Sequence, residues 1–344
     1  MAVDMQAPRR TTGAGLWVLA GVLLTVLVLV AVGAGAVAYE AGQDLDDLHG
    51  DAAIAADDTV PALVQRLQAE RNYATAYVLG IEDALDLGAA SFDDATVATD
   101  EALVAAQGDR PAATQDSLGD VEGTLADLRG AMPPPSASRT LDEVESAESL
   151  AAGYTALIDG VLDARDEAIL ASRSDPEVRR GTHLAILSLR QQHRAAWLVR
   201  EVLLYGVVQP TTPEAIAGLA ESVAEVQGGE AELDGLATGP YRAVADDTLA
   251  GDGLDELVSQ AEAALNEEPW SGGSGVDLAA VAGGSFTEGH DAFRAEVGAV
   301  VAERMDDLES EAEDRRRTAL LIAGAAVLGA VAVLAAVLVR ARAR

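Results

Sequence analysis

The sequence contains no cysteine and no lysine, and only 3% of its 344 residues are aromatic. Without cysteine, the chain can form neither disulfides nor cysteine-ligated metal sites. Without lysine, P-loop, Schiff-base and protein-kinase chemistry are excluded, because each of them depends on a lysine. Alanine, leucine and valine are abundant instead, a balance that favours helical bundles over a β-sandwich.

The charge is strongly one-sided, with 57 acidic against 23 basic residues and a net charge of −34. Binding to a phosphate backbone requires basic stripes, so this balance predicts no nucleic-acid partner. Every basic residue is arginine, and the lysine-free, Ala/Val/Gly/Asp-rich composition is typical of high-GC genomes such as those of actinobacteria.

Recognisable catalytic patterns are missing from the sequence. The histidines His49, His183, His193 and His290 are scattered without metal-ligand spacing, and we interpret them as surface or partly buried side chains. No serine lies in a G-x-S-x-G motif. Acidic residues are so frequent that most belong to solvated helix faces. The sequence therefore predicts a protein that is not an enzyme, with no catalytic residues, no metal site and no cofactor.

Two long uncharged runs, residues 16–38 and 319–339, are each long enough to cross a bilayer as a helix, at roughly 34 and 31 Å. The first also resembles a secretory signal peptide, since residues 36–38 read Ala-Val-Ala. Its apolar core exceeds the roughly 7–15 residues of a signal sequence, which favours an uncleaved membrane anchor.

Arginines at the chain ends set the expected orientation. They precede the first apolar run and follow the second, at Arg9, Arg10, Arg340, Arg342 and Arg344. By the positive-inside rule both termini are cytoplasmic and the acidic middle lies outside the plasma membrane, although residues 315–317 are arginines on the outer side. The predicted division is a cytoplasmic start (1–15), a first transmembrane helix (16–38), an extracytoplasmic domain (39–317), a second transmembrane helix (318–339) and a cytoplasmic tail (340–344).

The middle region shows apolar spacings of three and four residues and no alternating pattern, so it predicts helices throughout. One helix is expected from about Pro61 to Gly88, and others over 141–169 and 176–208. The prolines within 132–138 mark the clearest break, where we expect two sub-bundles to join. The predicted fold class is all-α, an extracytoplasmic antiparallel helical bundle between two transmembrane helices.

Two arginines in these predicted helices lack an acidic residue three or four positions away. Arg71, in "LVQRLQAERNYATAYVLG", lies at the margin of an apolar face. Arg200, in "AAWLVREVLLYGVV", lies in a run that is apolar on every side. A buried unpaired guanidinium is costly, so each requires a partner from elsewhere. Either an acidic residue of another helix pairs with it, or the two arginines share a small planar oxyanion.

The stretch "LQAER", ending at Arg71, resembles the opening motif of the nitrate- and nitrite-sensing (NIT) domain. "RAAWLVREVLLYG", residues 194–206, resembles the second arginine-bearing helix of that family. The layout also resembles actinobacterial sensor histidine kinases that carry this domain. The resemblance implies a dimeric helical bundle in which Arg71 and Arg200 bind nitrate or nitrite. The order of Arg200 and Glu201 is the reverse of the family's usual one, which leaves Arg194 as an alternative to Arg200.

The resemblance implies a membrane receptor for a small anion, nitrate or nitrite. No HAMP linker, kinase or other output domain follows residue 339, so we expect signalling through a separate partner such as a kinase. The alternative is a non-catalytic structural or interaction protein of the cell envelope without a small-molecule ligand. A homodimer is expected from the stripe Phe293 to Leu308 and from the small residues Ala325 and Gly329.

Overall fold

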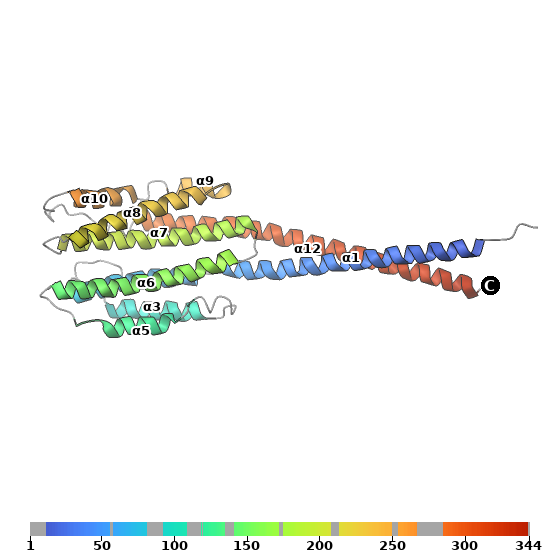
Figure 1. The fold of residues 1–344 in the computed structure, drawn as a ribbon, viewed down its shortest axis with the longest axis horizontal. Helices are drawn as coiled ribbons and strands as arrows, with labels where there is room; N and C mark the ends of the chain where they lie inside the picture. Colours follow the sequence, from blue (N-terminus) through green and yellow to red (C-terminus); the bar gives the residue numbers. More distant parts are fainter. Residues whose placement is uncertain are drawn as a thin grey trace, which may run out of the picture. The chain divides into compact units, whose positions relative to one another are not determined.

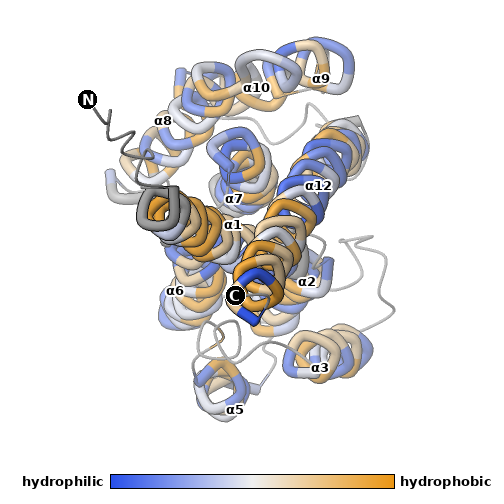
Figure 2. The backbone as a smooth tube through the Cα atoms, turned by 90° about the vertical axis from the view of Figure 1, so that its right-hand side faces the viewer, coloured by the Kyte–Doolittle hydropathy of each residue, from blue (hydrophilic) through white to orange (hydrophobic). Residues whose placement is uncertain are grey.

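The computed structural model describes residues 12–55, 58–80, 92–108, 118, 120–134, 141–171, 175–207, 213–249, 254–266 and 285–342. These residues contain helices and no β-strand, which confirms the all-α prediction. The helices, labelled in Figure 1 except for α2, which is labelled in Figure 2, are α1 (Thr12–Ala55), α2 (Thr59–Leu79), α3 (Phe92–Gln107), α5 (Val121–Ala131), α6 (Leu141–Ala171), α7 (Pro176–Val207), α8 (Pro213–Leu236), α9 (Pro240–Thr248), α10 (Leu254–Asn266) and α12 (Ser285–Arg342).

The chain divides into two compact units. One consists of Met1–His49 with Met305–Arg344, and the other of Gly50–Arg304. The first unit therefore contains most of α1 and the last part of α12. The second unit contains α2 to α10 and the first part of α12, and we call it the helical domain.

The helices of the first unit are long and apolar enough to cross a membrane. Candidate spans lie within Trp17–His49 and Phe286–Arg342, and almost none of their most apolar windows is buried. Leu19 and Leu328 are about 70% exposed, so these are not core helices of a globular protein. Figure 2 shows the hydrophobic colouring along the ends of α1 and α12 that face the viewer. Two candidate transmembrane helices thus flank the helical domain in sequence, as predicted.

The two helices of this unit pack along a seam with a seven-residue repeat. Buried positions on α1 are Ala38, Ala41 and Leu45, and those on α12 include Ala312, Ala319 and Ala326. A Cβ on Gly329 would lie 3.4 Å from the side chain of Leu27. Farther along α1, Asp44 lies 3.3 Å from Arg315 and His49 lies 3.3 Å from Glu309. Residue numbers thus rise along α1 while those of their partners fall along α12. This is an antiparallel helix pair with the spacing of a coiled coil.

The residues that the sequence analysis assigned to a dimer seam have partners within the chain. Phe293 and Val297 are fully buried, and Gly329 faces Leu27 of α1. The stripe on α12 therefore packs into its own subunit, because an amphipathic helix buries its apolar face wherever a matching face is available. The homodimer stays a prediction, but these residues no longer support it, because they are buried within the chain.

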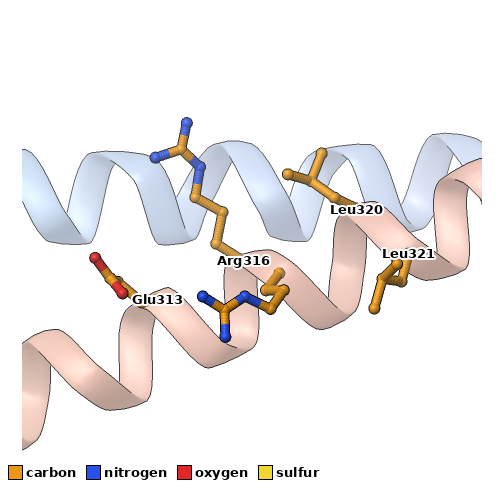
Figure 3. A pocket seen from close by; sticks show the side chains of 5 residues that line it. Glu313, Arg316, Leu320 and Leu321 are labelled. Carbon is orange, nitrogen blue, oxygen red and sulfur yellow. The ribbon is translucent and has the colours of Figure 1, made fainter.

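A shallow hollow of about 410 Å³ lies where the second apolar run begins. It is lined by Glu313, Arg316, Arg317, Leu320 and Leu321 of α12. In Figure 3, Glu313 and Arg316 precede Leu320 and Leu321 along the helix. The hollow thus marks the change from charged to apolar side chains at the predicted boundary near residue 318.

Two apolar clusters form the core of the helical domain. In the first, α2, α3, α5 and α6 contribute side chains such as Leu67, Leu103, Leu125 and Ile158. In the second, α7, α8, α10 and the start of α12 contribute Leu198, Leu219, Leu257 and Phe286. The N-terminal half of α7 also enters the first cluster through Ile186 and Leu189. Helix α7 therefore joins the two sub-bundles.

This division differs from the expected join near 132–138. Leu125 of α5 and Leu150 of α6 lie on either side of that segment, and both belong to the first cluster. Met132 to Pro134 form a connection inside one sub-bundle, because prolines end a helix without separating the cores of the elements they connect. The change of core occurs along α7.

Local signals explain several helix ends. Helix α2 ends at Leu79, earlier than the predicted Gly88, because Gly80 adopts φ 60° and its N–H bonds to the carbonyls of Ala76 and Tyr77. Asp120 caps α5 by accepting from the N–H of Gly123 at 3.0 Å. Asp175 accepts from the N–H of Glu177 at 2.9 Å and starts α7. The rest of the predicted helix, residues 81–88, lies outside the described residues.

Candidate anion-binding site

Helices α6 and α7 are antiparallel and connected by a ladder of acid–base contacts. Acidic residues of α6 face basic residues of α7 in reverse order: Asp166 contacts His183, Asp163 contacts Arg190 at 2.6 Å, and Asp159 lies 3.7 Å from His193. The next acidic residue that affects this face is Glu148, whose charge acts on Arg200. Thr155 stands between Asp159 and Glu148, so the ladder has a position without a carboxylate.

Arg71 of α2 occupies that position. Its side chain is fully buried, not marginal as the helical wheel suggested, and its Nη1 donates to Thr155 Oγ1 at 3.0 Å. The Nε and Nη2 atoms have no hydrogen-bond partner among the described residues. The guanidinium is thus held at one nitrogen, and the Nε–Nη2 edge is free.

Arg200 of α7 is in a matching state. It is 5% exposed, and its Nη1 donates to Glu201, the next residue on the same helix. Its Nε and Nη2 also find no partner within the described parts of the chain. Both arginines therefore present the edge that forms paired, parallel hydrogen bonds to planar oxyanions.

Trp197 brings the two guanidinium groups to one place. The Cζ of Arg200 lies 4.4 Å from the centre of the indole ring, and the Cζ of Arg71 lies 5.2 Å from it. The ring's negative face attracts each cation and compensates part of its charge. Trp197 comes one turn before Arg200 on α7, so helical geometry places the pair on one face. The sequence analysis did not assign Trp197 to the site.

The two arginines repel each other in this setting. Burial, followed by the charge of Arg200, lowers the pKa of Arg71 to about 9, although Asp159 and Glu201 oppose the shift. Burial also lowers the pKa of Arg200, against the charges of Glu201 and Glu148. Burial and a second cation thus both disfavour the charged form of Arg71, which a bound negative charge would favour.

The neighbouring Glu70, on the same helix, is by contrast a buried charge with a full set of hydrogen-bond partners. Its carboxylate accepts from Arg129 Nε at 2.8 Å and Nη2 at 2.9 Å, and from the Tyr154 hydroxyl at 2.7 Å. Arg129 also donates to Asp100 at 2.7 Å, and these bonds raise the pKa of Arg129 although burial acts the other way. Glu70 points away from Arg71, as expected for adjacent helical residues.

Two further observations concern the predicted candidates. His193 is 4% exposed and His290 2%, so the interpretation of these histidines as surface or partly buried side chains was wrong. Arg194, the alternative to Arg200, is partly exposed and does not appear among the arginines stacked on Trp197. No cluster of potential metal ligands occurs in the described ranges.

Comparison with known protein families identifies the family of this chain. The sequence model of the nitrate and nitrite sensing family matches residues 62–321, which is most of the chain. The chain belongs to the NIT family. This confirms the resemblance of its two arginine-bearing stretches to that family, and the chain carries a domain of a sensing family. Arg71 and Arg200 both lie within the matched NIT region.

A search of curated proteins returned no significant match. Among solved structures, the NIT chain is similar to one described as the structure of the NasR transcription antiterminator, with a TM-score of 0.55 and 17% sequence identity. The similarity covers 84% of this chain and 80% of that chain. At this identity the likeness shows a shared fold.

Proposed function

We propose that this NIT protein is a two-pass membrane receptor whose helical domain binds nitrate or nitrite between Arg71 and Arg200. In this proposal the site binds the anion and catalyses no reaction. The bound state would be passed to a separate signalling protein such as a kinase. Helix α12 is unbroken from Ser285 to Arg342 and so supplies a continuous element for that coupling.

One observation carries the proposal: the free Nε–Nη2 edges of two buried arginines that both contact the same indole ring. A small planar anion offers acceptors to both edges and supplies the negative charge that Thr155 leaves out of the α6–α7 ladder. The alternative is that a carboxylate of the chain itself pairs with the arginines. Among the described residues, no carboxylate bonds the Nε–Nη2 edge of either arginine. The family's description as nitrate and nitrite sensing supports the same class of ligand.

Calorimetry on the full chain in lipid nanodiscs tests the proposal, with nitrate, nitrite, chloride and sulfate as titrants. Nitrate and nitrite should bind, while chloride lacks the planar acceptors and sulfate carries an additional charge. Arg71→Lys and Arg200→Lys keep the charge and lose the fork, so each should weaken nitrate binding by about tenfold or more. The double variant should lose little more than either single one, because both arginines act on one ligand.

Arg294→Lys provides a matched control. Arg294 is also a largely buried arginine of the helical domain, but its donors are bound to Gln192 and Asp291. This variant should bind nitrate like the wild type. A chain that binds none of the four anions would contradict the receptor proposal and favour a scaffold without a small ligand.

The membrane topology is testable separately. A reporter fused after Arg344 should be active only in the cytoplasm, and one inserted near Pro134 only outside it. An exported C-terminus would overturn the proposed orientation.

A further inference from the structure

His193 shares a helix face with two members of the candidate site. It precedes Trp197 by four residues and Arg200 by seven, so all three project from the same side of α7. The imidazole is buried, and neither ring nitrogen has a hydrogen-bond partner among the residues described. Buried polar groups without partners are rare and costly, so this ring calls for an explanation.

Charged groups approach His193 from every packed element near it. Asp159 of α6 lies 3.7 Å away, just beyond hydrogen-bond range. Arg71 of α2, with Arg190 and Arg194 of its own helix, opposes protonation, and Glu225 of α8 acts on Asp159 and Arg194. Burial, followed by the three arginines, lowers the pKa of His193 well below its ordinary value. The ring is therefore neutral at neutral pH.

We infer that His193 is a positioning residue of the anion site, which takes up a proton when the anion binds. The inference rests on the proposed function. An anion bound to Arg71 compensates one of the charges that, together with burial, lower the pKa of the imidazole. With the repulsion from Arg71 compensated, protonation of the ring costs less, and an imidazolium can bond to Asp159, which lies 3.7 Å from it. Anion and proton then bind together, each strengthening the affinity for the other.

The sign of the pH dependence follows from this linkage. Proton uptake favours the anion complex below the pKa that His193 has in the complex, and this advantage is lost as the pH rises through that value. Nitrate affinity should therefore weaken as the pH rises toward that value, with a slope approaching about tenfold per pH unit. The slope reports one proton, and a purely structural histidine would not produce it.

Calorimetry of the full chain in nanodiscs, with nitrate as the probe, measures both quantities. Titrations at several pH values give the slope. Titrations at one pH in buffers of different ionisation enthalpy give the number of protons taken up. In His193→Gln the slope should flatten and the dependence on buffer should disappear. His183→Gln is the matched control on the same helix, since His183 is already bonded to Asp166, and it should keep both.

Glu201 is a second buried group that can bind a proton, because burial raises its pKa. In Glu201→Gln the absolute affinity should shift and the slope should persist. Nitrate binding that is independent of pH in the wild type, or a slope retained in His193→Gln, would overturn the role of His193 and leave the receptor intact. If His193→Gln does not fold, the number of protons that the wild type takes up on binding nitrate, measured from the buffer dependence, tests the inference instead. Absence of nitrate binding at every pH would overturn the proposed function itself.

Discussion

Glu70 and Arg71 are adjacent in the sequence and both are fully buried, yet their surroundings are opposite. Glu70 has three hydrogen bonds, from Arg129 and Tyr154. Arg71 has one, to the neutral Thr155. Because neighbouring helical residues point about 100° apart, one residue faces α5 and α6 inside the first core, and the other faces α7 at the seam between the sub-bundles.

The difference separates two uses of a buried charge. The Glu70–Arg129 pair is complete within the chain itself, so it serves the fold. The Arg71–Arg200 pair places two like charges on one indole ring, and under the proposed function a bound anion compensates them. The following variants test this contrast, in order of decreasing effect.

Glu70→Gln should have the largest effect. The amide cannot compensate the charge of Arg129, and breaking a buried pair destabilises a protein by about 3 kcal/mol or more. Urea unfolding of the full chain measures the change. Nitrate-induced stabilisation should survive in the fraction that folds, since Glu70 does not face the candidate site. A loss below about 1 kcal/mol would mean that the pair is replaceable.

Thr155→Asp should give Arg71 a paired environment like that of Glu70. A carboxylate at this position supplies the missing acid of the ladder and bonds Arg71, so nitrate affinity should fall by about 100-fold, or 2.7 kcal/mol. The apo protein should become more stable. Thr155→Asn, which is similar in size and neutral, is the control and should bind nitrate within a few-fold of the wild type. Undiminished nitrate binding by Thr155→Asp would place the anion elsewhere.

Arg71→Met should stabilise the apo protein by about 1 kcal/mol, because it replaces an incompletely paired buried charge by an apolar chain of similar length. Nitrate should no longer raise the melting temperature, as it does for any folded state that binds it. Arg129→Met is the matched control and should destabilise, because it leaves Glu70 unpaired. Equal destabilisation by both methionines would mean that Arg71 also serves the fold.

Asp100→Asn should have the smallest effect. Asp100 also bonds Arg129, but its side chain is 56% exposed, so the loss should stay under about 0.5 kcal/mol. The same urea unfolding measures it. A larger loss would show that the stability of the pair depends on its solvent-exposed end.

Much of the fold could be predicted from local sequence. The apolar runs and the proline and glycine boundaries follow from spacing along one helix, as does the absence of a carboxylate three or four positions from Arg71 and Arg200. The expectation that Arg200 needs a partner from elsewhere was wrong in part, because its Nη1 donates to the adjacent Glu201. The end of α2 could not be placed correctly, because whether Gly80 adopts a left-handed conformation depends on how the following chain is packed.

The composition of the site was less accessible, because it depends on contacts between helices. Arg129 lies 59 residues from Glu70 and Thr155 lies 84 from Arg71, and no spacing rule relates such positions. The signal that could have found His193 was present, since the spacing of His193, Trp197 and Arg200 by four and three residues defines one helix face. It was missed because histidines were considered only as metal ligands.

Trp197 gives the molecule an optical reporter at its own candidate site. The chain has three tryptophans. Of these, Trp17 lies in the first apolar helix and is 51% exposed, and Trp270 lies outside the described residues. The indole of Trp197 is in contact with both guanidinium groups, so its emission must respond when their charge is compensated. Replacing Trp17 and Trp270 by phenylalanine would leave a single fluorophore, and occupancy could then be followed in intact membranes without a label.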